Sequence, residues 1–208
     1  MKKTFRFFSI LAVAFSLTMA VSCDKTPEEE GGSNNNGNGN VNNLPTTIDE
    51  TFATGIPADW TTIDADGDGY NWASTHLDGG DLADADGNGA VFSQSYENNV
   101  GALTPDNYLV TPKIYIDGQT LTWQVGAQDA GFPNEHYAVL VGTIENGQFV
   151  SQGTLHEETF TGSSKAATNF YNRSVSLAQY KGKELCIAFR HYNCTDMYFL
   201  NIDNVKVQ

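Results

Sequence analysis

Three aspartates stand at alternate positions of one short stretch, Asp64-Ala65-Asp66-Gly67-Asp68-Gly69. In a tight loop, carboxylates with this spacing can all turn toward one hard cation, and glycine permits the positive φ angles that the loop needs. The stretch is not an EF-hand, because its twelfth position holds Thr75 rather than glutamate and its flanks are typical of strands. Asp64, Asp66 and Asp68 therefore predict a calcium (Ca2+) site that takes its remaining ligands from elsewhere or from water. The alternative is a hairpin turn rich in Asp-Gly.

A second run, Asp84-Ala85-Asp86-Gly87-Asn88-Gly89, repeats this pattern with asparagine as its third potential ligand. Asp81 lies just before it. Asp84, Asp86 and Asn88 are therefore further candidates for calcium ligands, because carboxylate and amide oxygens are the donors that calcium prefers.

The sequence holds no motif of zinc binding or hydrolysis. Its four histidines are scattered, and neither C-x-x-C nor H-E-x-x-H occurs, so a zinc site is not expected. No G-x-S-x-G is present, and no cysteine has an obvious histidine partner for nucleophilic catalysis. Pairs such as Glu157 with Glu158, or Asp129 with Glu135, could in principle serve a glycosidase, but acids are so common here that pairs arise by chance. We therefore expect a protein that is not an enzyme.

The charge balance limits the partners of the chain. It has 11 basic and 25 acidic residues, which give a formal net charge of −14. Because phosphate binding needs a basic surface, nucleic acid is not an expected partner, and adsorption to anionic lipid is unfavourable for the same reason. An acidic surface suits a protein that concentrates divalent cations. The alternative is that the acidity only keeps an exported protein soluble.

The N-terminus has the features of an export signal. Residues 1–6 are basic and contain no acid, and an apolar stretch from Phe7 to Val21 follows. This stretch is shorter than the roughly 20 residues that a membrane-spanning helix needs. Small residues then precede Cys23, as in a bacterial lipobox, so residues 1–22 are predicted to be a lipoprotein signal peptide and Cys23 the lipidated residue. The alternative is a plain secretory signal followed by a chance cysteine.

Residues 23–45 are predicted to form a disordered tether. Residues 31–40 contain only glycine, serine and asparagine, so they have no apolar surface to bury in exchange for being ordered. The acidic run Asp24–Glu30 resembles signals that send some Gram-negative lipoproteins to the outer face of the outer membrane, although any solvated tether could carry such a run. We therefore expect a folded domain over residues 46–208, held by its lipid anchor at the outer membrane and exposed on the cell surface.

The pattern of residues 46–208 predicts an all-β domain. Thr120–Val125 alternates polar and apolar residues, which is the mark of a half-buried strand, and Glu184–Arg190 does the same. Turn dipeptides such as Asn146-Gly147 separate the strands, and only Ser176–Tyr180 looks helical, for one turn. Many strands with almost no helix indicate a sandwich or a barrel. The predicted strands are 47–52, 60–63, 71–74, 90–96, 107–111, 120–127, 136–141, 148–152, 157–161, 169–175, 184–191 and 197–207.

The segment Asp106-Asn107-Tyr108-Leu109-Val110-Thr111-Pro112, together with others in the same order along residues 50–205, resembles one known family. This family is the cleaved-adhesin domains, which are the haemagglutinin/adhesin modules attached to gingipain proteases and are also grouped with choice-of-anchor domains. The resemblance covers the whole predicted domain. Its segments are Phe52–Trp72, Asp106–Pro112, Ala127–Ala130, Glu135–Val139, Ala188–His191, Cys194–Asp196 and Asn201–Val205.

The resemblance implies a jelly-roll β-sandwich of the galactose-binding-like and MAM-like type, with structural calcium. In such folds the first and last strands lie side by side, so Glu50 and Asp203 could share a cation and tie the two chain ends together. The alternative is that both are ordinary edge residues. Family members often have a second cysteine near the strand that here reads Ala90-Val91-Phe92-Ser93, so Cys194 lacks that partner. Whether it pairs with Cys186 stays open.

The resemblance, the anchor and the tether predict a surface binding module that attaches to host proteins or matrix. The first alternative is a glycan-binding module for nutrient capture, with Trp60, Trp72 and Trp123 either as stacking platforms or as core residues. The second is a structural component of a surface assembly. The sequence does not separate these three functions, because fold alone rarely decides function.

Overall fold

Two predicted strands have the bounds that the alternation of polar and apolar residues indicates, Thr120–Ala127 (β9) and Glu184–His191 (β13). The computed structural model describes residues 44–74, 87, 89–161 and 170–208, which belong to one unit of the chain, Val41–Gln208. The other strands of this part are Ile48–Glu50 (β1), Thr61–Asp64 (β2), Ala73–Ser74 (β3), Val91–Gln94 (β4), Tyr96–Glu97 (β5), Gly101–Ala102 (β6), Asn107–Val110 (β7), Ile114–Tyr115 (β8), His136–Glu145 (β10), Gln148–Thr159 (β11), Tyr171–Ser176 (β12) and Phe199–Val207 (β14). The predicted helical turn is the 3-10 turn Ala178–Tyr180 (η1).

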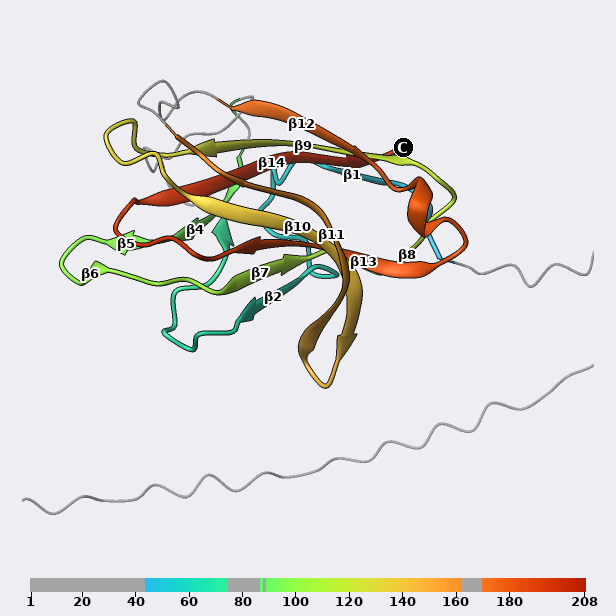
Figure 1. Cartoon of the computed structure of the whole chain (residues 1–208), viewed down its shortest axis with the longest axis horizontal. Coiled ribbons are helices and arrows are strands. Elements are labelled where there is room, and N and C mark those ends of the chain that lie inside the picture. The colour runs from blue at the N-terminus through green and yellow to red at the C-terminus, as the bar shows by residue number, and fades with distance from the viewer. Residues whose placement is uncertain (1–43, 75–86, 88, 162–169) are drawn as a thin grey trace, which may run out of the picture. The chain divides into compact units, whose positions relative to one another are not determined.

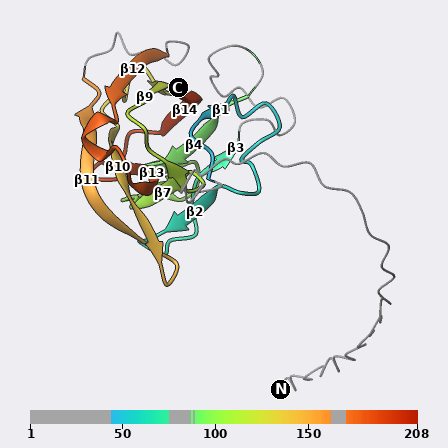
Figure 2. The ribbon, with the colours of Figure 1, turned by 90° about the vertical axis from the view of Figure 1, so that its right-hand side faces the viewer.

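Twelve of the strands form two six-stranded antiparallel sheets that pack face to face, and β5 and β6 pair as a separate two-stranded sheet (Figure 1). The first sheet has the order β12-β9-β14-β4-β3, with β1 paired to β14, and the second has the order β11-β10-β13-β7-β2, with β8 paired to β13 (Figure 2). Each sheet takes strands from both halves of the chain. The first and last strands pair through Ile48 and Val207, as the resemblance implies. The all-β, jelly-roll β-sandwich expected from the sequence is therefore confirmed.

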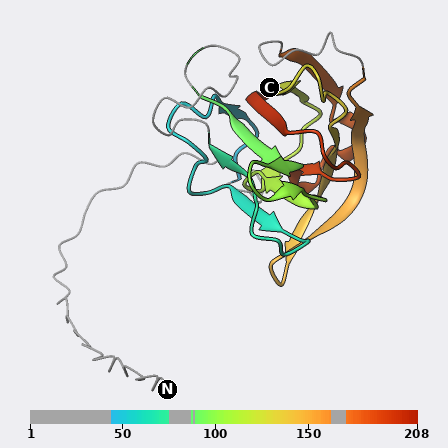
Figure 3. The ribbon, with the colours of Figure 1, turned by 90° about the vertical axis from the view of Figure 1, so that its left-hand side faces the viewer.

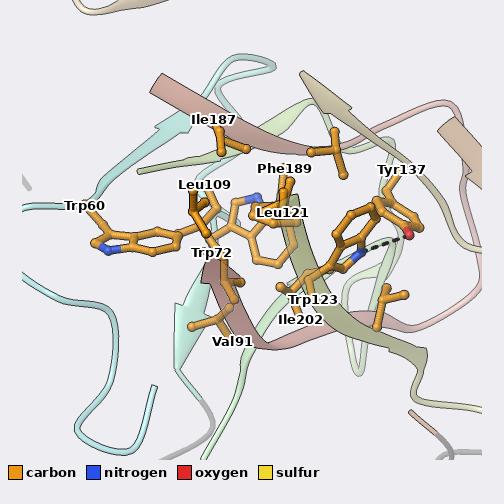
Figure 4. Close-up of a cluster of buried hydrophobic side chains, with 14 of the residues drawn as sticks. Trp60, Trp72, Val91, Leu109, Leu121, Trp123, Tyr137, Ile187, Phe189 and Ile202 are labelled. Carbon is orange, nitrogen blue, oxygen red and sulfur yellow. Dashed lines mark hydrogen bonds between the residues drawn. The ribbon is translucent and has the colours of Figure 1, made fainter. Parts of the chain in front are cut away.

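The core lies between the two sheets and contains all three tryptophans. Trp60, Trp72 and Trp123 are 8%, 4% and 1% exposed, so they are core residues and not stacking platforms for a ligand (Figure 4). The indole N–H of Trp123 donates to the hydroxyl of Tyr137 across the sandwich (3.2 Å), and Tyr137 in turn donates to Glu158 (2.8 Å). These two hydrogen bonds provide partners for the polar atoms of two large buried side chains, Trp123 and Tyr137.

A second apolar cluster covers the outer face of the second sheet. Residues that alternate with the core-facing ones build it, so this sheet is apolar on both faces. The cluster consists of Ile63, Val110, Ala138, Leu140, Cys186 and Ala188, with Tyr108, Phe149 and Tyr192 packed against it. The β10–β11 hairpin projects beyond the rest of the sheet in all three views (Figures 1 to 3). Two register shifts between its strands bend it, which is the usual effect of a β-bulge.

The sequence pattern predicts two separate strands, 148–152 and 157–161, and this prediction is wrong. Gln148–Thr159 is the single strand β11, which pairs with β10 along its length. Gly153 lies inside it against the hydroxyl of Tyr180, where a side chain would not fit, so this glycine marks a close approach rather than a turn. The short strands β5, β6 and β8 carry too few residues for a periodic pattern and are not predicted as separate elements. None of the described residues lies in a helix long and apolar enough to cross a membrane.

Candidate functional site

The structure gathers the three aspartates of the predicted calcium loop. Asp64 ends β2, and Gly67 and Gly69 turn the chain with φ angles of 77° and 88°. Each of Asp64, Asp66 and Asp68 offers one carboxylate oxygen within 4.8 Å of the others. The loop Asp64–Gly69, called the acidic loop below, therefore has the convergent oxygens that a hard cation needs.

Backbone amides hold the carboxylates of the acidic loop in place. Asp64 accepts hydrogen bonds from the N–H groups of Gly67 (2.7 Å) and Gly69 (3.0 Å). Asp66 accepts from Asp68 (3.0 Å). Partial burial raises the pKa of Asp66, as does repulsion from Asp68 and Asp64, although backbone hydrogen bonds oppose the shift. The loop therefore keeps like charges together at an energetic cost that a bound cation would remove.

The other predicted metal ligands have different outcomes. Glu50 on β1 faces Val205 of β14 and accepts a hydrogen bond from the N–H of Phe52 (2.6 Å), while Asp203 on β14 is fully buried. The paired chain ends that a shared cation requires are thus present, but neither residue belongs to a group of three metal-type donors within the described part of the chain. Asp84, Asp86 and Asn88 lie outside the described residues, and so does Cys23.

A second cluster of potential ligands is buried between the sheets. Glu135, directly before β10, and His191, at the end of β13, are both 0% exposed. Glu135 Oε2 lies 2.9 Å from His191 Nε2, and Cys194 Sγ lies 3.1 Å from the same nitrogen. Cys186 and Cys194 are both free thiols, so the two do not pair. Burial, followed by the Glu135 carboxylate, raises the pKa of the Cys194 thiol.

Two serines complete this buried polar cluster. Ser93 Oγ on β4 lies 2.9 Å from His191 Nδ1, and Ser95 Oγ donates to Glu135 Oε1 (2.9 Å). Ser93, His191 and Glu135 are thus arranged like the hydroxyl, imidazole and carboxylate of a hydrolase triad. All three are 0% exposed, so no substrate can reach the hydroxyl. This arrangement therefore gives no support to hydrolysis.

A partly exposed group of polar and aromatic residues lies on the outer face of the second sheet. Arg190 on β13 faces Tyr108 on β7 as a direct cross-strand pair, and its guanidinium carbon lies 5.1 Å from the Tyr108 ring centre and 4.1 Å from that of Tyr192. Asp106 accepts two hydrogen bonds from the guanidinium, at 2.6 and 2.8 Å. Two rings and one bidentate ion pair therefore fix the direction of this arginine.

Glu157 on β11 borders the same group. It accepts hydrogen bonds from the hydroxyl of Tyr192 and from His136 Nε2, which lies 3.2 Å away. Burial, with the hydrogen bond to Glu157, raises the pKa of Tyr192 to about 12, so its hydroxyl remains a neutral donor at physiological pH. We call Tyr108, Arg190 and Tyr192, with Asp106 and Glu157, the arginine face.

A groove of about 400 Å³ opens beside the arginine face. Its lining comes from the segment before β7 and from the end of β13 and the turn after it. The lining residues are Thr104, Pro105, Asp106, Arg190, Tyr192, Asn193, Cys194 and Thr195. The backbone N–H of Asp106 also donates to the Asp66 carboxylate, so the acidic loop holds the residue that orients Arg190.

Sequence reasoning located the acidic loop but not the arginine face or the buried polar cluster. The acidic loop is a local pattern of residues. The other two depend on strand register and on pairs as far apart as Ser93 and His191, which are separated by 98 positions. One local signal was available for the buried polar cluster, because His191 and Cys194 form an H-x-x-C pair.

Comparison with known proteins identifies the family. The profile of the Cleaved Adhesin Domain matches residues 45–207. Hemagglutinin A of Porphyromonas gingivalis strain W83 is 40% identical over 186 residues, which cover 83% of this chain and 8% of that protein. Gingipain R1 of the same species is 39% identical over 171 residues, which cover 78% of this chain and 10% of that protein. The chain thus spans a tenth or less of the length of these relatives.

Solved structures agree with the sequence comparison. The K1 Cleaved Adhesin domain of Lys-gingipain from P. gingivalis W83 superposes with a TM-score of 0.68 at 40% identity, and the match covers 78% of this chain and 98% of that one. The module TmCBM61, solved in complex with beta-1,4-galactotriose, superposes with a TM-score of 0.52 at 12% identity over 76% of this chain and 94% of that one, which shows a shared fold alone. The chain therefore belongs to the Cleaved Adhesin Domain family.

Proposed function

We propose that this chain is an adhesin-type module that attaches a cell to host or matrix proteins through the arginine face. Arg190 carries the proposal, because it is held between Tyr108 and Tyr192 and remains partly exposed, at 28% of its side chain. Tyrosine and arginine are, with tryptophan, enriched at the energetic centres of protein interfaces. Adhesin domains among the solved relatives support the same function.

The arginine face is already ordered before a partner arrives. Asp106 fixes the guanidinium, and Glu157 fixes the hydroxyl of Tyr192. A side chain that is already immobile loses little conformational freedom on binding, so more of its contact energy is available to the complex. This order favours a role for the face in recognition over one as an ordinary solvated surface.

The experiment is a binding assay of the chain against a panel of host and matrix proteins. Arg190→Lys keeps the charge but loses the bidentate pair and the flat stacking surface, so it should weaken binding about 10-fold or more. Arg173→Lys is the matched control, because Arg173 on β12 forms a similar bidentate pair with Glu158 on β11 (2.8 and 2.9 Å) and is not part of the arginine face. Equal binding by both variants would show that the arginine face is not the site.

Glycan binding is the second candidate function, and the aromatic surface of the same sheet favours it. Tyr108 and Phe149 lie 5.8 Å apart between ring centres, next to carboxylate, guanidinium and hydroxyl groups. Sugars bind to such combinations of ring faces and hydrogen-bonding groups. A glycan array run beside the protein panel separates the two functions, because sugar binding without protein binding would contradict the adhesin proposal. The distant likeness to TmCBM61 shows a shared fold and does not identify a ligand for this chain.

Calcium binding by the acidic loop belongs to the same proposal. A cation held by Asp64, Asp66 and Asp68 would stiffen the loop and, through Asp66, the position of Asp106. We expect the affinity for the partner to fall when calcium is chelated. A second ion at Glu50 and Asp203, or one at Asp84, Asp86 and Asn88, remains a proposal of the same kind.

Export and anchoring complete the proposed function. The signal-like residues 1–22 and Cys23 support a lipoprotein at the outer membrane, with the folded domain presented at the cell surface. Cys23→Ser should release the protein from the membrane fraction of cells into the soluble fraction. If the variant stays with the membranes as the unchanged chain does, the lipid anchor is wrong.

A further inference from the structure

Glu135, His191 and Cys194 supply three different donor atoms to one buried point. A carboxylate oxygen, an imidazole nitrogen and a sulfur lie within 4.8 Å of one another. This mixed set differs from the oxygen-only set of the acidic loop, and it matches the donors that zinc takes in proteins. Neither calcium nor magnesium favours sulfur.

The three donor atoms of this cluster converge on one another. Glu135 Oε2 and Cys194 Sγ both approach His191 Nε2, at 2.9 and 3.1 Å, although this nitrogen carries at most one proton. Without a metal, the thiol donates to the carbonyl of His136, which is 4.0 Å away. A cation between the three atoms would be bound by all of them at once.

We infer that Glu135 Oε2, His191 Nε2 and Cys194 Sγ bind one zinc ion. In a tetrahedral zinc site with bonds of about 2.0 to 2.3 Å, neighbouring ligand atoms lie about 3.3 to 3.6 Å apart. The two contacts of His191 Nε2 are shorter than this, so the ligands separate by roughly half an ångström when the ion enters. The Glu135 carboxylate and the Cys194 thiolate balance the two positive charges of the zinc ion, so the buried site is neutral overall. Water takes the fourth position, as it does where proteins supply three ligands.

The surrounding residues orient each ligand toward the proposed ion. Ser93 Oγ contacts His191 Nδ1, which leaves Nε2 for the metal. Ser95 Oγ and the backbone N–H of Tyr198 both donate to Glu135 Oε1 (2.9 Å each), which leaves Oε2 for the metal. Such partners fix the tautomer and the direction of metal ligands. Cys194 also lines the groove beside the arginine face, which gives the ion a path from solvent.

The proposed ion has a structural consequence for the binding surface. It connects the segment before β10, which carries Glu135, to the turn after β13, which carries Cys194. That turn continues directly from Arg190 and Tyr192 and lines the groove beside them. Zinc would therefore fix the turn after β13, whereas the acidic loop contacts the arginine face through Asp106.

The test uses the full chain freed of metal and then titrated with Zn2+ or Co2+. We expect one ion per chain and, with cobalt, a thiolate-to-cobalt charge-transfer absorption that reports sulfur ligation without any mutation. Cys194→Ser should remove this absorption, whereas Cys186→Ser and Cys23→Ser, the matched controls, should keep it. Ser93→Ala should weaken zinc binding about 10- to 100-fold while keeping the absorption at saturation.

Three results would overturn the proposal. The first is the lack of a thiolate absorption in the unmutated chain with cobalt, which does not depend on whether any variant folds. The second is an absorption that survives Cys194→Ser or disappears in Cys186→Ser. The third is zinc that is removed by Asp66→Asn and not by Glu135→Gln, because the ion would then belong to the acidic loop.

Discussion

The acidic loop and the buried polar cluster each bring three potential metal ligands within 4.8 Å, and they do so by opposite means. In the loop, alternate residues of one short stretch supply all three carboxylates, two of the three side chains are exposed, and backbone amides hold them. In the cluster, two distant segments supply three kinds of donor, Glu135 and His191 are fully buried, and hydrogen bonds with Ser95, Tyr198 and Ser93 hold them. Local sequence is therefore enough to build the first, whereas the second exists only once both sheets have paired.

This difference determines how much the free energy of unfolding falls when a residue of either cluster is replaced. An exposed carboxylate keeps most of its hydration and is screened by salt, so losing its partners matters little. A buried carboxylate has given up its hydration entirely and depends on Ser95, Tyr198 and His191 for compensation. Substitution in the two clusters should therefore change stability by very different amounts.

The largest effect is expected for Glu135→Ala. The change leaves the hydroxyl of Ser95, the N–H of Tyr198 and the imidazole of His191 without their buried partner, and breaking such a network costs about 3–5 kcal/mol. Urea unfolding with and without metal measures the loss. Glu157→Ala is the control, since its side chain is 48% exposed, and it should cost less than about 1 kcal/mol. Similar losses in both variants would remove the contrast between buried and exposed clusters.

Calcium should have the next largest effect, through the acidic loop. A ligand present at 100 times its dissociation constant stabilises a protein by about 2.7 kcal/mol, which is roughly 5 to 10 °C for a chain of this size. Thermal melts with calcium and with a chelator measure the difference. Asp66→Asn should abolish the calcium-dependent rise, and Glu135→Gln should leave it intact. Coincident melts of the unchanged chain would contradict calcium binding.

Glu158 is partly buried, so its contribution to stability should lie between that of Glu135 and those of the acidic loop. This contribution depends on pH. Burial alone would raise the pKa of Glu158, but hydrogen bonds from His156, Arg173 and Tyr137 outweigh it and hold the pKa well below its usual range. A depressed carboxyl pKa adds stability that is fully present above the unfolded value of about 4.3 and is lost as the pH falls below it. Glu158→Gln should therefore flatten the fall in unfolding free energy below about pH 4.5.

Urea unfolding measured at several pH values tests this prediction. Glu145→Gln, at the exposed end of β10, is the control and should keep the acid-dependent fall of the unchanged chain. An unaltered slope in Glu158→Gln would mean that the ion pair with Arg173 is screened by solvent. The pair would then behave like the exposed carboxylates of the acidic loop rather than like Glu135.

Sequence patterns predicted the features whose causes are local. The predicted strands 120–127 and 184–191, which contain the period-2 alternation, match β9 and β13 to the residue, and the spacing of aspartates predicted the acidic loop. The features that depend on long-range pairing were not predictable in this way. Arg190 meets Tyr108 only through the β13–β7 register, and Gly153 marks a close approach to Tyr180 that no pattern of neighbouring residues announces. The buried polar cluster combines residues of β4, β13 and two connecting segments, so its site becomes visible only in three dimensions.

The smallest effect is expected for Asp66→Asn in the presence of a chelator. Because burial and the neighbouring aspartates raise the pKa of Asp66, its charge is unfavourable in the folded state without a cation, and asparagine removes that charge while it can still accept from Asp68 N–H. The unfolding free energy should therefore stay within about 0.5 kcal/mol of the unchanged chain or rise slightly. The same substitution lowers stability when calcium is present, so the sign of its effect reverses with the metal. A clear loss of stability in the chelator would show that Asp66 supports the fold through the backbone of Asp106 rather than through a cation.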